Sequence, residues 1–267
     1  MTTAPPPAAP GSDLVIGDYF VHVPREVRGR LEVLVALHGM GGAGPSFVQA
    51  LEERADRQRW LLVAPTYAYG DWRDPGIVAG EGTRLIPQLH DFLAALPART
   101  GLDLAPRAAL YGFSRGAQMA HRFAIIYPEQ TLGVAAIAAG TYTLPLAEMT
   151  VQGQRVPLRF PFGVADLSER FGRAFDGAAV QHIPFWVAVG ADDRNMEEVP
   201  RQWDPYVGRT RVERAQQFVQ CLTDAGISAQ LTIFPGVGHE LTDTIRTQAL
   251  DFIAALPPQT GTGSATP

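Results

Sequence analysis

The sequence predicts an α/β fold in which a mostly parallel central sheet carries helices on both faces. Strand-like and helix-like segments alternate along the chain, which is typical of parallel strands joined by crossover helices. Two strand-like segments, 31–37 and 60–64, are almost entirely apolar, as expected for strands buried on both faces. The chain has 267 residues, and α/β folds of this length commonly form one domain.

The first half of the chain supplies an edge strand and two helices. Residues 18–23 alternate between polar and apolar side chains, as in an antiparallel edge strand. Ser46 and Gln49 have the spacing of a capping box, which predicts a helix start. Apolar residues at helical spacing predict a helix over 85–96, in which Pro87 fits only the first turn.

The second half continues the alternation. A small apolar strand ends at Phe113 and is followed by a helix over 117–127, which Pro128 terminates. Three further strands and two further helices are expected: strands at 132–138, 185–189 and 230–234, and helices at 212–225 and 245–256.

One long segment interrupts the alternation. Residues 141–184 form an insertion between the strands that carry Ala136 and Val187, and this segment is too long for an ordinary loop. Within it, 149–160 predicts a hairpin and 166–172 a short helix. We expect the insertion to lie beside the active site. The sequence does not decide whether it acts as a mobile lid.

The expected organisation is a single domain over 13–256 between two tails. Residues 1–12 are rich in Pro and Ala, and 257–267 are rich in Pro, Gly, Thr and Ser, so both tails are expected to be disordered.

Composition excludes several classes of protein. The net charge is -5 without any basic block, which argues against nucleic-acid binding. All 22 basic residues are Arg, so lysine-based Schiff-base chemistry is not possible. No apolar run approaches the roughly 20 residues that span a bilayer, so we expect no membrane insertion. The sequence does not indicate an oligomeric state.

The single cysteine and the N-terminus bear on the compartment. Cys221 has no partner for an intrachain disulfide, and the first residues lack the basic and apolar regions of a secretory signal. These features favour a cytoplasmic protein. A secreted protein with its signal peptide removed is the alternative.

The segment 109–117 joins an apolar strand to a helix through Gly112-Phe113-Ser114-Arg115-Gly116. A Gly-x-Ser-x-Gly motif in this context is a nucleophile elbow, in which a sharp turn exposes the serine hydroxyl. Because the turn brings strand and helix close together, glycines are needed on both sides. Ser114 is therefore the candidate nucleophile.

A serine nucleophile needs an imidazole base, and the imidazole needs a carboxylate that orients it. On this architecture both partners should follow the serine, in the order acid and then histidine, each at a strand end. His239 follows the strand at 230–234 and is the expected base. Asp193 follows the strand at 185–189 and is favoured as the acid over the adjacent Asp192.

The other histidines are less suitably placed: His22, His38 and His90 precede the serine, His121 lies inside the next helix, and His182 ends the insertion.

An oxyanion that develops during acyl transfer needs two backbone N–H donors. The Arg115 amide, directly after the serine, is one candidate. The other lies in the glycine-rich loop 38–42, where we favour the Met40 amide over that of Gly41. The loop has neither the spacing of a dinucleotide-binding motif nor that of a P-loop.

Four segments together, 38–42, 112–116, 190–193 and 238–240, resemble the α/β-hydrolase superfamily, and the resemblance covers nearly all of the chain between the tails. More narrowly, the sequence is similar to carboxylesterases, feruloyl esterases and polyhydroxybutyrate depolymerase-like proteins. The resemblance implies an α/β-hydrolase fold and a serine hydrolase. Secreted depolymerases usually carry disulfides and a substrate-binding module, which this chain lacks.

The expected function is hydrolysis of small carboxylic esters through an acyl-enzyme, with no metal or organic cofactor. Trp72, Tyr142 and Phe162 are candidate substrate-binding residues near the pocket mouth. The alternatives are a peptidase or amidase, a polyhydroxyalkanoate depolymerase, and a catalytically silent binding protein of the same fold. The sequence does not reveal the ester or the acyl-chain length.

Overall fold

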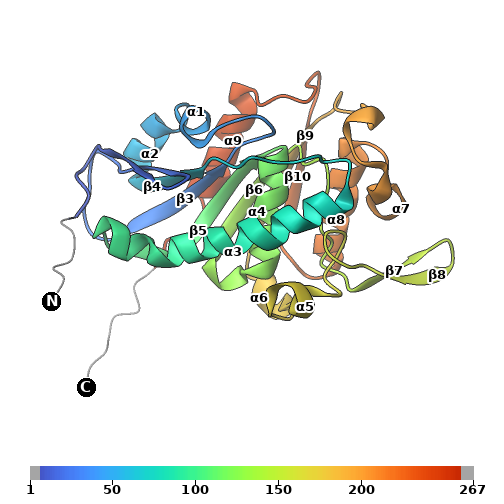
Figure 1. Ribbon diagram of the computed structural model, residues 1–267. Helices are drawn as coiled ribbons and strands as arrows, with labels where there is room; N and C mark the ends of the chain where they lie inside the picture. Colours follow the sequence, from blue (N-terminus) through green and yellow to red (C-terminus); the bar gives the residue numbers. More distant parts are fainter. Residues whose placement is uncertain (1–6, 260–267) are drawn as a thin grey trace.

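An eight-stranded sheet runs through the middle of the computed structural model, which describes residues 7–259 (Figure 1). The two strands at one edge pair in antiparallel fashion, and every pair from β4 onward is parallel. The predicted fold class is therefore confirmed. In spatial order the strands are β1 (Asp13–Ile16), β2 (Tyr19–His22), β4 (Trp60–Pro65), β3 (Leu31–Leu37), β5 (Leu104–Phe113), β6 (Thr131–Ile137), β9 (Phe185–Gly190) and β10 (Ala229–Phe234).

The edge of the sheet differs from the expected one. The strand predicted at 18–23 is β2, but it lies second in the sheet, because β1 pairs with it and forms the edge. Side chains join the two strands: His22 Nδ1 lies 2.8 Å from Asp13 Oδ1. β1 is only four residues long with alternate residues exposed, so its sequence resembles a loop.

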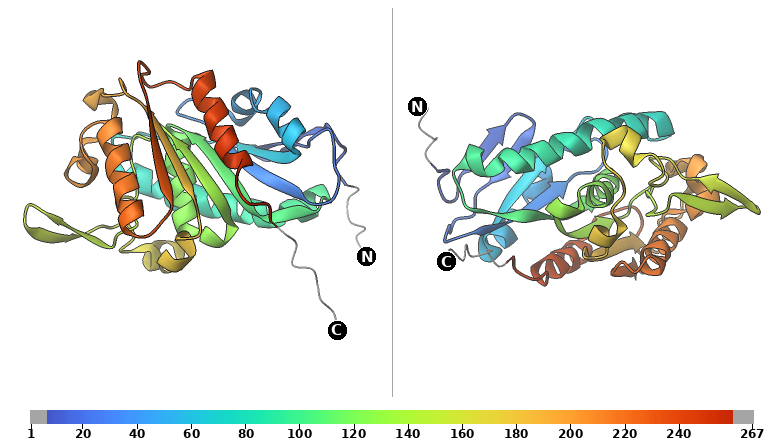
Figure 2. Two further views of the ribbon diagram at one scale, coloured as in Figure 1. Left: turned by 180° about the vertical axis from the view of Figure 1, so that it is seen from behind. Right: turned by 90° about the horizontal axis from the view of Figure 1, so that it is seen from below.

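Helices cover both faces of the sheet, and each face has its own apolar core. α3 and α4 lie in front of the sheet in Figure 1, whereas α1, α2 and α9 lie behind it, as the reverse view in Figure 2 shows. Apolar residues of α8 join the core on the α3 and α4 side. The helices are α1 (Gly44–Val48), α2 (Glu52–Gln58), α3 (Pro75–Thr100), α4 (Arg115–Ile126), α8 (Arg211–Asp224) and α9 (Asp243–Ala254).

Two helix starts were predicted wrongly. The capping box at Ser46 does not form, because the N-cap of α1 is Ala43 and Ser46 Oγ donates to its carbonyl oxygen at 3.1 Å. α3 begins at Pro75, capped by the Asp74 side chain, so Pro87 lies inside the helix and not in its first turn. The tertiary packing of α3 outweighs the helix hydrogen bond that this proline lacks.

The insertion between β6 and β9 has the predicted hairpin and short helix. Ala136 and Val187 are direct partners on these neighbouring strands. The hairpin of β7 (Glu148–Val151) and β8 (Gln154–Pro157) projects from the body of the molecule (Figures 1 and 2). The short helix predicted at 166–172 is α5 (Leu167–Phe171), which ends at Gly172, and α6 (Gly177–Val180) follows.

Four short helical turns complete the secondary structure of residues 7–259. They are η1 (Pro128–Gln130), η2 (Met196–Glu198), η3 (Arg201–Trp203) and α7 (Asp204–Val207). Three of these, η2, η3 and α7, lie in the segment between β9 and α8, which follows the carboxyl end of β9.

The ends of the domain extend further than expected. Residues 1–6 and 260–267 of the expected tails lie outside the described residues. Between them and the domain, the Ala8 N–H donates to the Thr100 carbonyl oxygen at 2.7 Å, and Gln259 Nε2 donates to the Arg107 carbonyl oxygen at 2.7 Å. The prediction of disorder is therefore wrong for these inner tail residues, because the domain pairs their polar groups.

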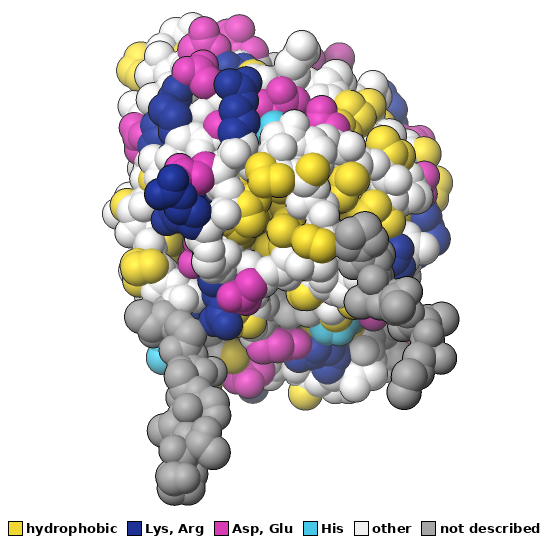
Figure 3. Space-filling view, turned by 90° about the vertical axis from the view of Figure 1, so that its left-hand side faces the viewer, with side chains coloured by type: hydrophobic (Ala, Val, Ile, Leu, Met, Phe, Trp, Pro, Cys, Tyr) yellow, Lys and Arg dark blue, Asp and Glu magenta, His cyan; other side chains and the backbone are white. Residues whose placement is uncertain are grey.

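Two further features concern the distribution of surface charge and the length of the apolar helices. On the face shown in Figure 3, Arg side chains lie beside Asp and Glu side chains and do not form a separate basic patch. Within residues 7–259, no helix combines the length and apolar character that crossing a membrane requires.

Candidate active site

The serine sits at a strained turn between β5 and α4. Ser114 has φ 54° and ψ -112°, in the left-handed half of backbone space that non-glycine residues rarely adopt. A Cβ on Gly116 would lie 1.9 Å from the Leu37 carbonyl oxygen, and one on Gly112 would lie 2.5 Å from the Gly116 carbonyl carbon. Gly116 is therefore required by close packing of the turn against β3, and Gly112 by close packing of β5 against the start of α4.

Three side chains from separate strand ends form one hydrogen-bonded chain. His239 Nε2 lies 3.0 Å from Ser114 Oγ, and His239 Nδ1 lies 2.8 Å from Asp193 Oδ2. Because an ionised carboxylate only accepts hydrogen bonds, Nδ1 carries the proton and Nε2 is left as the acceptor for the serine hydroxyl. The structure thus brings the three predicted residues together in the relationship that general-base activation of a serine requires.

The two adjacent aspartates differ completely in environment. Asp193 is buried and accepts from His239, whereas Asp192 is exposed and its side chain has no hydrogen-bond partner within the described chain. Their backbone groups also differ, since the Asp192 N–H donates to the Val237 carbonyl oxygen at 2.9 Å and the Asp193 N–H donates to the Gly190 carbonyl oxygen at 3.2 Å. The geometry therefore favours Asp193 as the acid.

A second partner holds the other oxygen of Asp193. Arg211, the first residue of α8, places Nη1 2.8 Å from Asp193 Oδ1. The same guanidinium donates to the Glu198 carbonyl oxygen at 3.0 Å and lies 3.3 Å from the Glu198 carboxylate. Sequence analysis missed Arg211, because nothing in the chain links a helix start to a residue 18 positions earlier.

The glycine-rich loop after β3 lies against the elbow. A Cβ on Gly39 would lie 3.4 Å from Ser114 Cβ, and Gly41 adopts φ 70°. His38 fixes the loop, because its Nε2 accepts from the Tyr67 N–H at 2.9 Å and its Nδ1 lies 2.6 Å from the Gly39 carbonyl oxygen. Burial lowers the pKa of His38, which keeps the ring neutral and able to accept.

The two candidate oxyanion donors are near the serine. Met40 and Arg115 line the same cleft as Ser114 and His239. Within the described residues, neither the Met40 N–H nor the Arg115 N–H donates a backbone hydrogen bond, so both amides are available to a ligand. This availability matches what a developing oxyanion needs.

The cleft around Ser114 has a volume of about 210 Å³. Of the three predicted substrate-binding residues, Trp72 lines it, but Tyr142 and Phe162 do not. Tyr142 is completely buried and stacks on Phe218, while Phe162 packs against Trp203 at 4.4 Å between ring centroids. Both expectations are therefore wrong, because these aromatic rings attach the insertion to the core.

Buried polar groups form the floor of the cleft. Arg115 pairs with Glu81 of α3 and donates to Gln118 Oε1 at 2.7 Å. The same Gln118 oxygen accepts from Thr141 Oγ1 at 2.8 Å. Gln118 follows Ser114 by one helical turn, so its i, i+4 spacing is a signal that sequence analysis overlooked.

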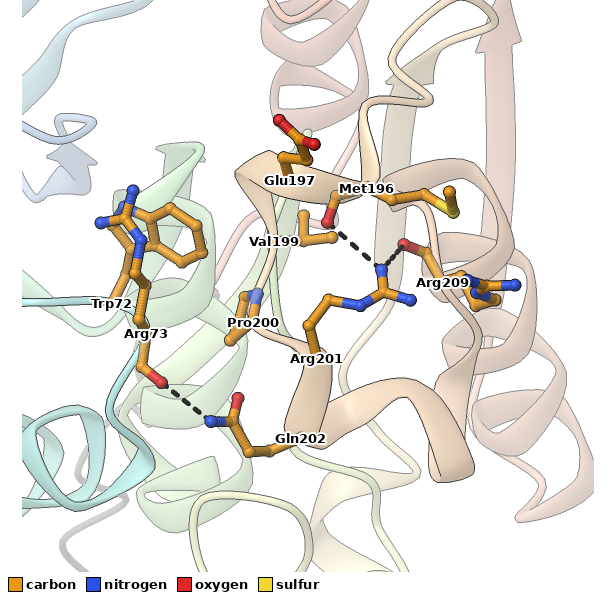
Figure 4. A pocket seen from close by; sticks show the side chains of 9 residues that line it. All are labelled: Trp72, Arg73, Met196, Glu197, Val199, Pro200, Arg201, Gln202 and Arg209. Atoms are coloured by element: carbon orange, nitrogen blue, oxygen red, sulfur yellow. Dashed lines mark hydrogen bonds between the residues drawn. The ribbon is translucent and has the colours of Figure 1, made fainter.

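A larger pocket of about 420 Å³ adjoins the cleft and shares Trp72 and Pro200 with it (Figure 4). Arg73 lies over the Trp72 ring at 4.1 Å, and Gln202 Nε2 donates to the Arg73 carbonyl oxygen at 3.1 Å. The hydrogen bond from Gln202 joins the loop before α3 to the segment after β9. The two segments thus form opposite walls of the pocket.

Comparison with known proteins supports the fold. The sequence matches no family model and no curated protein. Solved structures that are similar include a poly(aspartic acid) hydrolase from Sphingomonas sp. KT-1, with a TM-score of 0.68 and 18% identity over 92% of this chain and 99% of the other. A poly(3-hydroxybutyrate) depolymerase from Bordetella parapertussis has a TM-score of 0.65 and 22% identity over 90% and 86% of the two chains.

The esterase PE8 has a TM-score of 0.59 and 22% identity, over 94% of this chain and 100% of its own. These structures are esterases and hydrolases of the α/β-hydrolase fold, so the chain has that fold, as its motifs implied.

Proposed function

We propose that this α/β-hydrolase-fold protein is a serine esterase that cleaves carboxylic esters through an acyl-enzyme intermediate. The observation that carries the proposal is the hydrogen-bonded chain from Ser114 Oγ through His239 to Asp193, with distances of 3.0 and 2.8 Å. A catalytically silent binding protein does not need these three hydrogen-bonded side chains, so their presence favours an enzyme over that alternative.

In the acylation step, Ser114 Oγ attacks the ester carbonyl carbon while His239 Nε2 accepts the hydroxyl proton. The negative charge that develops on the carbonyl oxygen is stabilised by the Met40 and Arg115 amides. Asp193 stabilises the imidazolium through Nδ1. When the tetrahedral intermediate collapses, the bond to the alcohol oxygen breaks and Nε2 returns the proton to that oxygen.

In the deacylation step, water takes the place of the serine. His239 Nε2 accepts a proton from water as the water oxygen attacks the acyl carbon. The intermediate collapses by breaking the bond to Ser114 Oγ, which receives the proton back. The products are a carboxylic acid and an alcohol, and the protein returns to its starting protonation state without a metal or organic cofactor.

The pocket beside the cleft supports a second candidate function. The pocket of about 420 Å³ beside Trp72 extends the binding surface beyond the scissile bond, which suits a longer substrate (Figure 4). Two similar structures are a poly(aspartic acid) hydrolase and a poly(3-hydroxybutyrate) depolymerase. Cleavage of a polyester or a polyamide by the same triad is therefore the alternative to small-ester hydrolysis.

The decisive experiment measures hydrolysis of p-nitrophenyl acetate and butanoate by the full chain, together with labelling by a fluorophosphonate probe. Replacing Ser114 by Ala is expected to abolish labelling and to lower turnover by about 10³-fold or more, because the nucleophile is lost. Parallel assays with a p-nitroanilide amide and with poly(3-hydroxybutyrate) separate the alternatives. Amide cleavage at a comparable rate would favour an amidase.

Ser168 provides a matched control, because it is exposed on α5 and outside the cleft. The Ser168→Ala variant is expected to retain wild-type turnover and labelling. Wild-type turnover in the Ser114→Ala variant would show that another residue is the nucleophile.

A further inference from the structure

We propose that the cleft selects esters carrying a neutral oxygen acceptor near the scissile bond, which Gln118 Nε2 binds beside Gly140. This inference rests on the proposed esterase function and specifies its substrate class. It starts from an N–H donor at the floor of the cleft that lacks a hydrogen-bond partner within the described chain.

The orientation of the Gln118 amide is fixed by its neighbours. Its Oε1 accepts from Arg115 Nη1 at 2.7 Å and from Thr141 Oγ1 at 2.8 Å, so the oxygen is the atom that faces these donors. The NH₂ group must therefore face the other way, toward the cleft that Gln118 lines. Gln118 is only 5% exposed, so a ligand that fills the cleft excludes water from this N–H donor.

Arg211 lines the cleft beside this donor but offers no N–H to a ligand. Its two terminal nitrogens are occupied by Asp193 and Glu198, and its Nε is buried too completely for a ligand atom to reach. Gln118 Nε2 is therefore the donor on which the preference rests.

Gly140 lies beside the Gln118 amide. A Cβ on this glycine would lie 3.3 Å from Gln118 Nε2. Arg214 Nη1 donates to the Gly140 carbonyl oxygen at 2.5 Å, which fixes the backbone there. The absence of a side chain at Gly140 leaves room for an acceptor beside Gln118 Nε2.

The local charges favour a neutral acceptor over a carboxylate. Arg211 contacts two carboxylates, Asp193 and Glu198, and Arg115 pairs with Glu81. No cation at the floor of the cleft is therefore left uncompensated within the described residues, and Glu198 also lines the cleft. An ether, hydroxyl or carbonyl oxygen can accept from Gln118 Nε2 without adding a negative charge.

The acceptor can belong to either side of the ester, and two pairs of isosteric substrates distinguish these sources. The acyl pair is methyl 3-methoxypropanoate and methyl pentanoate, and the alcohol pair is 2-methoxyethyl acetate and butyl acetate. Hydrolysis is followed by pH-stat titration, and each kcat/KM is divided by the rate constant for hydroxide-catalysed hydrolysis. In one pair, the oxygen-bearing ester is expected to be preferred by about 10-fold, since a hydrogen bond contributes on the order of 1.4 kcal/mol.

Two variants test whether this donor causes the preference. Gln118→Glu keeps an oxygen for Arg115 and Thr141 but replaces the N–H donor by an acceptor, and Gly140→Ala places a methyl group 3.3 Å from Gln118 Nε2, where the acceptor would lie. Both are expected to reduce the preference to about 1, with the non-oxygenated ester of each pair serving as internal reference. Thermal unfolding of each variant checks that it is folded.

Three outcomes overturn parts of the proposal separately. Hydrolysis of all four esters without a preference, or a preference that survives in both variants, overturns the inference and leaves the esterase function intact. No hydrolysis of any ester overturns the esterase function and the inference with it. Faster hydrolysis of methyl hydrogen succinate than of methyl 3-methoxypropanoate would overturn the neutral acceptor, because a carboxylate would then be preferred.

Discussion

Arg211 and Asp193 form a buried ion pair, with Nη1 2.8 Å from Oδ1, on the opposite side of the carboxylate from His239. Asp193 is 3% exposed, so it meets little water and relies on these two partners. Because each oxygen has its own donor, the carboxylate cannot rotate without losing one of them. The relationship makes Arg211 a positioning residue for the proposed triad.

Replacing Arg211 by Gln is expected to lower kcat for methyl pentanoate by about 10-fold or more and to lower the free energy of unfolding by about 3–5 kcal/mol, because Asp193 loses its buried counter-charge. Arg211→Lys restores a cation and is expected to recover most of kcat. Kinetics and urea unfolding check both expectations. A purely structural role predicts lower stability but an unchanged kcat for the folded fraction, and no specific recovery by Lys.

The adjacent aspartates offer a direct comparison. Asp193→Asn is expected to lower kcat by about 10³–10⁴-fold, because an amide that donates to Nδ1 favours the wrong histidine tautomer. Asp192→Asn makes the same chemical change on an exposed side chain and is expected to alter kcat by less than 2-fold, roughly the scale of a surface change. Steady-state kinetics on one ester decides between them; a larger loss in the Asp192 variant would reverse the assignment.

Sequence reasoning located the site well because its main residues obey a local rule. Ser114, Asp193 and His239 each follow a strand of the parallel part of the sheet, and the carboxyl ends of parallel strands meet at one edge of the sheet. The order of these residues along the chain therefore implied that they lie together. β3 at Leu31–Leu37 was predictable for the same reason, since its apolar run is bounded by polar and glycine residues.

The parts that were missed depend on contacts between distant segments. The start of α3 contains Gly76, Gly80 and Gly82, which favour a loop, yet Gly82 lies in the helix where a Cβ would be 2.5 Å from Phe160 Cζ. A helix glycine that accommodates a ring from the insertion cannot be identified without knowing that contact. Tyr142 is a similar case: its carbonyl oxygen accepts from Trp203 Nε1 at 3.0 Å, and the sequence does not show which aromatic residues face the core.

Replacement of a glycine by alanine should lower the free energy of unfolding at one position in this chain and raise it at another. Gly116→Ala would place a methyl group 1.9 Å from the Leu37 carbonyl oxygen, and this backbone atom of β3 cannot move cheaply. We expect a loss of more than about 3 kcal/mol of stability, or failure to fold. Gly80→Ala, in α3 with no atom within 4 Å of its Cβ, is expected to add up to about 1 kcal/mol. Urea unfolding measures both; tolerance of alanine at Gly116 would contradict the elbow packing.

Two buried neutral histidines should make the protein less stable in acid. Burial, assisted by the positive charge of Arg122, lowers the pKa of His121 well below its usual value, and burial also lowers that of His38. In each ring Nε2 accepts a backbone N–H, at 3.0 Å from Thr143 and 2.9 Å from Tyr67, and protonation removes that acceptor.

The sign of the pH effect follows from proton uptake. Below about pH 6.5 the unfolded chain protonates both histidines while the folded protein does not, so stability falls with falling pH, by up to about 1.4 kcal/mol per pH unit for each ring. Urea unfolding between pH 7.5 and 5 should show this decline. His121→Gln removes one titrating ring and should make the decline shallower, although stability at pH 7.5 also decreases. His182→Gln changes an exposed ring and should leave the slope unchanged; an equal slope in the His121 variant would contradict the account.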